Sequence, residues 1–175
     1  MSATTIEGKT SPLSQQQVHW RSYYGPWAIV TGASDGIGRE MARHLAMSAM
    51  NLVLVARRSS VLEQLSQELS AQYGIQTQII SADLSQSAAV DAVIEATNDL
   101  DIGLLVACAG FGTSGPFINA NLEQELNMLD LNCRAVLAMS HHFGQRFARR
   151  GRGGIILMSS LLAFQGVPLS ANYAA

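Results

Sequence analysis

The stretch TGASDGIG, Thr31–Gly38, decides the fold, because it joins an apolar run to an amphipathic segment. The run is Trp27–Val30, and after the turn apolar residues recur at helical spacing, at Met41, Ala42, Leu45 and Ala46. A glycine-rich turn at a helix N-terminus lets the backbone approach an anion, which free N–H groups and the helix dipole attract. A strand, such a turn and a helix in succession predict a site for the pyrophosphate of a dinucleotide. The alternative is an ordinary glycine-rich turn between a strand and a helix.

Outward from this turn, further apolar runs alternate with helical patterns. The runs expected to be strands are Leu52–Val55, Ile75–Ile80, Ile102–Ala107 and Gly154–Ser159. Helices are expected from Ser60, which has capping-box spacing to Glu63, over Ala88–Thr97 and over Leu122–Arg149, and residues 161–175 are expected to be loop and a first helical turn. Strands that alternate with helices of about ten or more residues form right-handed βαβ units and a parallel sheet. The sequence therefore predicts a doubly wound α/β fold of Rossmann type, with strand order 3-2-1-4-5.

Composition and charge limit the classes of protein to which the chain can belong. It has 175 residues, of which 48% are hydrophobic and 14% charged, a balance typical of a globular domain. We expect one dinucleotide-binding domain over 25–175, preceded by a tail or short helix over 1–24. The net charge of −2 gives no electrostatic case for binding nucleic acid or an anionic membrane. The basic run Arg146–Arg152 is interpreted as the solvated end of a helix and its loop.

The sequence also bears on the compartment. Residues 1–17 lack the apolar core of a secretory signal, and no apolar run reaches the roughly 20 residues that span a bilayer. Cys108 and Cys133 belong to no pair motif, and we expect two buried thiols in a reducing compartment. These features predict a soluble, cytoplasmic protein.

A pair of arginines follows the second predicted strand. A dinucleotide fold places there either an acid for a ribose 2′-hydroxyl or an arginine for a 2′-phosphate. The strand ends Ala56–Arg57–Arg58 and has no acid. A planar guanidinium can bond two phosphate oxygens, and cations are unfavourable at a helix start unless an anion lies nearby. The pair favours NADP over NAD, the alternative being two surface arginines.

The glycine spacing resembles the TGxxxGxG signature of the short-chain dehydrogenase/reductase family, and the resemblance runs from about Trp27 to Ala175. It implies that Asp83–Leu84, after the third strand, contacts the adenine; the alternative is an acid that ends the strand or caps a helix. It also implies that Ala109 and Gly110, the matching half of the family's NNAG segment, leave room for the cofactor; Ala107 and Cys108 replace the asparagines, which puts one hydrogen bond that braces the sheet in question. The residues expected to bind NADP(H) are Gly32, Ser34, Asp35, Gly36, Ile37, Gly38, Arg57, Arg58, Asp83, Leu84, Ala109 and Gly110.

The same resemblance implies three catalytic residues. Asn132 would hold a water of the proton relay, the alternative being a tolerated polar residue that packs on the sheet. Ser160 would hold the carbonyl oxygen and Tyr173 would be the proton donor or acceptor; these two residues have the family's separation. A free phenol, with a pKa of about 10, needs a nearby cation to work near neutral pH. The family supplies a lysine four residues after the tyrosine, at position 177 here, and the sequence ends at Ala175. We therefore expect a chain that is incomplete at its C-terminus, lacks the segments of the substrate pocket and is catalytically inactive at this length.

The predicted function is that of an NADP(H)-dependent oxidoreductase that interconverts a carbonyl and an alcohol on a small-molecule substrate. The alternative is a non-catalytic, NADP-binding regulatory or structural module. Apolar residues in the loop that follows Ser160 fit either a lipophilic substrate or plain loop packing. The resemblance implies that the long helix pairs, together with the helix that carries the tyrosine, in a dimer interface, and the apolar residues of the predicted helix Leu122–Arg149 cover more than one side. The residues concerned are Leu126, Leu129, Val136, Leu137, Met139 and Phe143. The full-length protein is therefore expected to be a homodimer or homotetramer.

Overall fold

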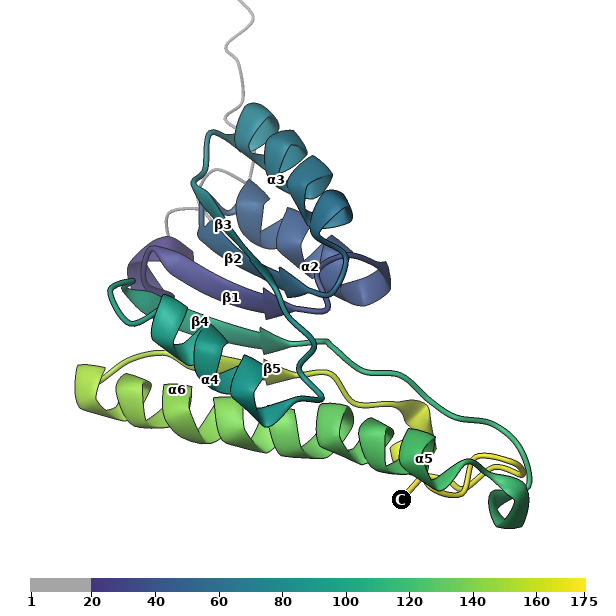
Figure 1. The fold of residues 1–175 in the computed structure, drawn as a ribbon. Helices are drawn as coiled ribbons and strands as arrows, with labels where there is room; N and C mark the ends of the chain where they lie inside the picture. Colours follow the sequence, from purple (N-terminus) through teal and green to yellow (C-terminus); the bar gives the residue numbers. More distant parts are fainter. Residues whose placement is uncertain (1–19) are drawn as a thin grey trace, which may run out of the picture.

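Five short parallel strands form the centre of the molecule, in the order β3-β2-β1-β4-β5 (Figure 1). The computed structural model describes residues 20–175, so of the segment expected as a tail or short helix only 20–24 can be assessed, and these are helical. Residues 1–19 lie outside the described part. The strands are β1 (Trp27–Thr31), β2 (Asn51–Ala56), β3 (Thr77–Ser81), β4 (Ile102–Ala107) and β5 (Gly154–Leu157). The strand order and the parallel direction predicted from the sequence are confirmed.

Helices cover both faces of this sheet (Figure 1). On one face lie α2 (Gly36–Met47) and α3 (Ser59–Tyr73). On the other lie α4 (Ser87–Ala96) and a long helical run, composed of α5 (Leu122–Leu129), the π-helical segment η2 (Asp130–Ala135) and α6 (Val136–Arg150). Two short 3₁₀ helices lie outside these layers in the sequence: η1 (Phe117–Asn119) precedes α5, and η3 (Leu161–Ala163) follows β5.

The three central strands β1, β2 and β4 are mainly apolar because successive side chains enter different cores. In β1, Ala28 and Val30 pack with the core under α2 and α3, whereas Ile29 packs with the core under α4 and α6, and all three are fully buried. A strand that is covered on both faces cannot show the polar alternation of a half-exposed strand. The continuous apolar runs in the sequence are thus the mark of a two-sided parallel sheet.

Four local expectations are wrong. Strand β3 spans Thr77–Ser81 rather than Ile75–Ile80. The capping box does not form: α3 begins at Ser59, its N-cap is Arg58, and no side chain caps it, so Ser60 already lies inside the first turn. Strand β5 ends at Leu157 rather than Ser159, and its pairing with β4 ends at the same residue. Neither cysteine is fully buried, contrary to expectation: Cys108 is half-buried, and Cys133, on η2, is exposed.

The basic run at the end of α6 is bonded to main chain rather than simply solvated. Arg146 donates to the carbonyls of Thr97 and Leu100 at 3.1 and 2.8 Å. Arg150 donates to the carbonyls of Tyr24 and Ile102 at 2.7 and 3.1 Å. These bonds satisfy carbonyls at the amino-terminal edge of the sheet and fix the end of α6 there, which corrects the interpretation from sequence.

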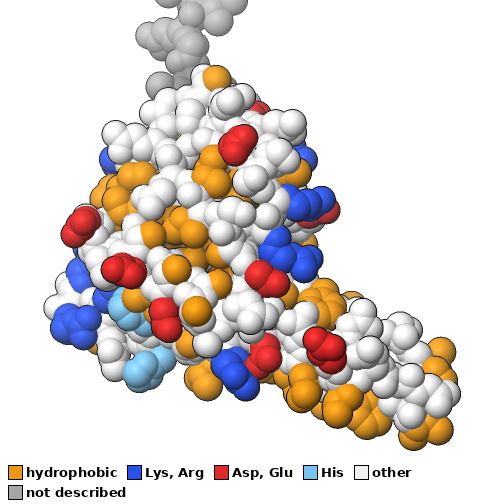
Figure 2. Space-filling view, viewed as in Figure 1, with side chains coloured by type: hydrophobic (Ala, Val, Ile, Leu, Met, Phe, Trp, Pro, Cys, Tyr) orange, Lys and Arg blue, Asp and Glu red, His pale blue; other side chains and the backbone are white. Residues whose placement is uncertain are grey.

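The long run α5–η2–α6 extends past the sheet, so that α5 lies at the narrow end of the molecule (Figure 1). Hydrophobic side chains gather on the surface of this end (Figure 2). Within 20–175, no helix is both long enough and apolar enough to span a bilayer.

Candidate active site

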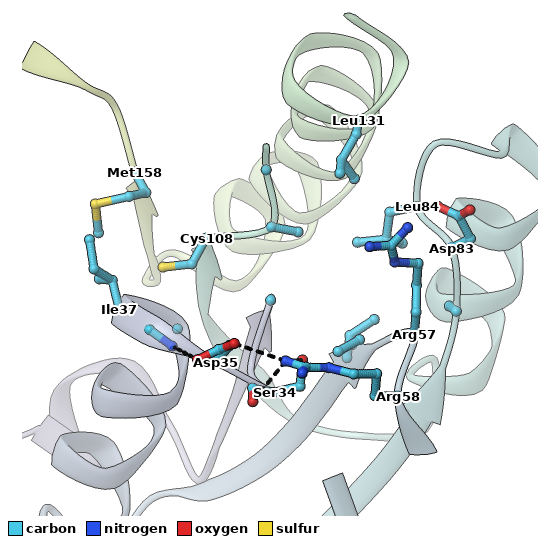
Figure 3. Close-up of a pocket in the computed structure, with 18 residues that line it drawn as sticks. Ser34, Asp35, Ile37, Arg57, Arg58, Asp83, Leu84, Cys108, Leu131 and Met158 are labelled. Carbon is cyan, nitrogen blue, oxygen red and sulfur yellow. Dashed lines mark hydrogen bonds and ion pairs between the residues drawn. The ribbon is translucent and has the colours of Figure 1, made fainter. Parts of the chain in front are cut away.

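A cleft of about 580 Å³ opens at the carboxyl ends of β1, β2 and β4 (Figure 3). This is the edge of a doubly wound sheet where ligands bind, beside the point at which the strand order reverses. The chain brings together four separate segments there, and every residue expected to contact NADP(H) lines the cleft. They are Gly32, Ser34, Asp35, Gly36, Ile37, Gly38, Arg57, Arg58, Asp83, Leu84, Ala109 and Gly110.

The glycines of the turn shape the cleft in two ways. Gly36 has a φ of 49°, and a Cβ added there would meet nothing within 4 Å, so the residue borders open space. A Cβ added at Gly38 would collide with the carbonyl oxygen of Gly32, and one added at Gly32 would lie 2.9 Å from the main chain of Ala109. Gly38 and Gly32 therefore allow α2 and β4 to pack closely against the turn, while Gly36 leaves room in front of the helix.

Asp35 and Arg58 form an ion pair at the rim of the cleft. The Asp35 carboxylate accepts the N–H of Gly36 at 2.8 Å and so caps α2. Its other oxygen lies 3.1 Å from Arg58, which also donates to the hydroxyl of Ser34 at 3.2 Å. The hydrogen bond from Arg58, and then that from Gly36, lower the pKa of Asp35. Arg58 is thus already paired with an anion of the protein, Asp35. Its position at a helix start therefore no longer by itself favours a phosphate.

Arg57 lies on the opposite side of the same segment and extends toward Leu84 and Asp83 (Figure 3). Within 20–175 its guanidinium makes neither an ion pair nor a hydrogen bond. Asp83 is engaged locally, because its carboxylate accepts the main-chain N–H and the hydroxyl of Ser85 at 3.2 and 2.9 Å. Of the two arginines that follow β2, Arg57 is therefore the one whose charge is available to a ligand in the cleft.

A threonine braces the strand that forms the back of the cleft. The hydroxyl of Thr31, at the end of β1, accepts the main-chain N–H groups of Cys108 and Ala109 at 3.1 and 3.0 Å. This contact ties the segment after β4 to β1, where the family's asparagines are absent. Burial raises the pKa of the Cys108 thiol, which lines the cleft near Met158.

Asn132 holds the loop that follows β4. Its amide accepts the N–H of Phe111 at 3.1 Å and donates to the carbonyl of Phe111 at 2.8 Å. A Cβ added to Gly110 would lie 3.1 Å from the Asn132 Oδ1. This residue of η2 therefore fixes the wall of the cleft through its side chain, a contact that the sequence did not predict.

Ser160 and Tyr173 lie on the segment after β5. The Ser160 hydroxyl accepts the N–H of Leu162 at 3.2 Å and caps η3. The Tyr173 ring packs against Gly112, where an added Cβ would lie 3.2 Å from its Cδ2. Among the residues that the structure describes, no hydrogen bond joins these two hydroxyls, and neither they nor Asn132 line the cleft.

Six further residues line the cleft and were not predicted. Four of them flank predicted residues at the ends of β2, β3 and β4, and this position is the signal that could have found them. Leu131 and Met158 come from η2 and from beyond β5 (Figure 3), and nothing in the sequence marks them. The six are Val55, Ala56, Ala82, Cys108, Leu131 and Met158.

Curated relatives resemble most of this chain. The 7beta-hydroxysteroid dehydrogenase of Clostridium sardiniense is 34% identical over 158 residues, which cover 90% of this chain and 60% of the relative. The very-long-chain 3-oxoacyl-CoA reductase of Aspergillus terreus is 34% identical over 154 residues, covering 85% of this chain and 44% of the relative. The chain thus spans about 60% of the length of the hydroxysteroid dehydrogenases that it matches.

Solved structures agree with this likeness. One reported for the stereoselectivity of 7beta-hydroxysteroid dehydrogenase has a TM-score of 0.85 and 32% identity, and covers 88% of this chain and 61% of its own. A short-chain dehydrogenase from Sphingobium yanoikuyae, solved in complex with NADPH, has a TM-score of 0.81 and 32% identity. The match covers 85% of this chain and 59% of that structure's chain. A family model described as short chain dehydrogenase matches residues 26–175. The chain therefore belongs to the short-chain dehydrogenase family.

Proposed function

We propose that the full-length protein is an NADP(H)-dependent oxidoreductase that interconverts a carbonyl and an alcohol. One observation carries the proposal: four segments that are distant in sequence supply twelve expected cofactor residues, and all twelve line a single cleft. The hydroxysteroid dehydrogenases and the acyl-CoA reductase among its relatives support the reaction class.

The residues in the cleft fit a phosphorylated dinucleotide. The amino end of α2, with the open space at Gly36, suits a pyrophosphate. The guanidinium of Arg57, which has no partner among residues 20–175, suits a ribose 2′-phosphate, because a charged donor forms short, strong bonds to phosphate oxygens. The small residues Ala109 and Gly110 leave room for the cofactor beside the end of β4. The neighbour solved with NADPH supports this cofactor.

In this proposal the dinucleotide supplies or accepts the hydride, and residues of the chain handle the proton. The Ser160 hydroxyl holds the carbonyl oxygen, and the Tyr173 phenol donates a proton to that oxygen in reduction and takes it back in oxidation. Asn132 supports the relay from η2, where it also fixes the main chain of Phe111. Hydride on carbon and proton on oxygen together convert the carbonyl to an alcohol.

A second candidate is an NADP-binding regulatory or structural module. It is favoured by one observation: within 20–175, Ser160 and Tyr173 share no hydrogen bond and do not line the cleft. Such a module would need the cleft but neither hydroxyl.

Binding and turnover of the full-length protein separate the two candidates. We expect NADPH to bind more tightly than NADH in a fluorescence titration. NADPH should then be oxidised steadily with at least one of benzaldehyde, cyclohexanone and a 7-oxosteroid. Tyr173→Phe should bind NADPH like the wild type and lose about a hundredfold or more in rate. Tight NADPH binding without turnover on any probe would favour the module.

A further inference from the structure

A buried carboxylate outside the cofactor cleft joins two segments of the site. Glu125, on α5, is only 7% exposed and borders a cavity of about 270 Å³ together with Thr113 and Asn172. Its Oε2 accepts the hydroxyl of Thr113 at 3.0 Å and the amide of Asn172 at 2.7 Å. The same amide lies 3.3 Å from the main-chain carbonyl of Glu125. Glu125 thus connects the loop after β4 with the residue that precedes Tyr173.

The loop that Glu125 holds is fixed at further points. Asn132 bonds both main-chain groups of Phe111. Farther along, the N–H of Gly115 donates to the carbonyl of Leu169 at 2.8 Å. Between these anchors, Gly112 abuts the Tyr173 ring. The loop therefore forms the surface against which the tyrosine rests, and Glu125 bonds both the loop, at Thr113, and the segment of the tyrosine, at Asn172.

Core packing does not account for a glutamate at this position. The other fully buried residues on this face of α5–η2–α6 are apolar, among them Met128, Ala135, Met139 and Phe143. A buried carboxylate is costly unless donors satisfy it, and here both donors come from the segments that it joins. Its place in the first turn of α5 also lets the helix dipole stabilise the negative charge.

We propose that Glu125 is a positioning residue for Tyr173, acting through Asn172; this inference rests on the proton-transfer role proposed for Tyr173. Consecutive Cα atoms are about 3.8 Å apart, so a shift of Asn172 passes directly to its neighbour. A misplacement of about 1 Å can cost on the order of a hundredfold in rate. Loss of the Glu125 contacts should therefore slow the chemical step without weakening the cofactor cleft, which Glu125, Thr113 and Asn172 do not line.

The test uses the full-length protein with NADPH and whichever carbonyl probe it reduces. Glu125→Ala and Asn172→Ala should bind NADPH within about twofold of the wild type, and hydride transfer per bound NADPH should fall about tenfold or more in a single turnover. The double variant should fall no further than either single one, because both remove the same contact. Glu125→Gln keeps an oxygen acceptor for both donors, and we expect it to retain most of the rate.

Several controls separate a positioning role from a structural one. A merely structural defect would lower the number of NADPH sites and leave the rate per site and its isotope effect with deuterated NADPH unchanged. That result, or additive losses in the double variant, would overturn the inference. If Glu125→Ala does not fold, Asn172→Ala carries the same test. A wild-type rate in Tyr173→Phe would instead refute the proposed function, and with it the role of Glu125.

Discussion

At the scale of single residues, the glycines on either side of Ile37 constrain the turn differently. Gly36→Ala should place a methyl group in the cleft, weaken NADPH binding at least about tenfold, and cost only about 1–2 kcal/mol of stability for its positive φ. Gly38→Ala should instead destabilise the domain, because its methyl group would collide with the carbonyl of Gly32. Urea unfolding and NADPH titration of both variants provide the measurement. A stable Gly38→Ala, or wild-type binding by Gly36→Ala, would contradict this assignment.

The two arginines after β2 should contribute unequally to cofactor preference. Arg57 is unpaired among the described residues, whereas Arg58 is held by Asp35 and Ser34. Arg57→Ala should therefore reduce the ratio of NADPH to NADH affinity by about tenfold to a hundredfold, since a charge-assisted bond contributes about 1.5–3 kcal/mol. Arg58→Ala should have a smaller effect on this ratio. Titration of both variants with both cofactors decides, and a larger effect at Arg58 would reverse the assignment.

The sequence could predict residues of the cleft where a motif fixes their position at a strand end. The glycine turn and Arg57 are such cases, because parallel strands bring their carboxyl ends to one edge. It could not predict that Arg58 pairs with Asp35, since that contact joins two loops. Glu125 was missed although a signal existed: it lies at helical spacing with Met128, Asn132 and Ala135, so a charge stands on the buried face of the helix.

At the scale of elements, strands and helices with a strong apolar period were predictable, and their ends were less so. The long helix was expected over 122–149 and is helical from Leu122 to Arg150, but its π-helical turn over Asp130–Ala135 was not foreseen. Such turns are rare and often lie at functional sites, and this one contains Asn132, whose amide bonds the main chain of Phe111. The end of α3 at Gly74 was predictable, because a left-handed C-cap with φ 67° favours glycine.

The end of α6 should depend strongly on one arginine. Arg150 donates to two main-chain carbonyls and pairs with Asp101 at 2.9 Å, and its side chain is 17% exposed. Arg150→Ala should therefore lower the free energy of unfolding by about 1–3 kcal/mol. Arg149→Ala, at an exposed position of the same turn, is the matched control and should change it by less than about 0.5 kcal/mol. Equal effects of the two changes in urea unfolding would show that the carbonyl contacts do not stabilise the domain.

At the scale of the whole molecule, the long helix has two apolar faces. The inner face packs on the sheet through Met139 and Phe143, which are 1% and 0% exposed. Leu126, Leu129 and Leu137 point outward and are 51%, 41% and 72% exposed, while Val136 is half-buried. This division agrees with the sequence argument that these residues cannot all face the sheet. We call these three exposed leucines of α5 and α6 the leucine stripe, and apolar side chains that gather on a surface can mark an interaction site.

We therefore expect the full-length protein to associate through this stripe as a homodimer or homotetramer. Leu137→Glu and Leu126→Glu should each shift the protein toward monomer in size-exclusion chromatography with light scattering, because burying a carboxylate in an apolar interface is costly. Gln67→Glu adds the same charge on the exposed side of α3, across the sheet, and should leave the mass unchanged. Each variant should keep the wild-type circular dichroism spectrum, since the leucines do not pack in the domain core. A full-length protein that is monomeric before any substitution would show that the stripe is covered in another way.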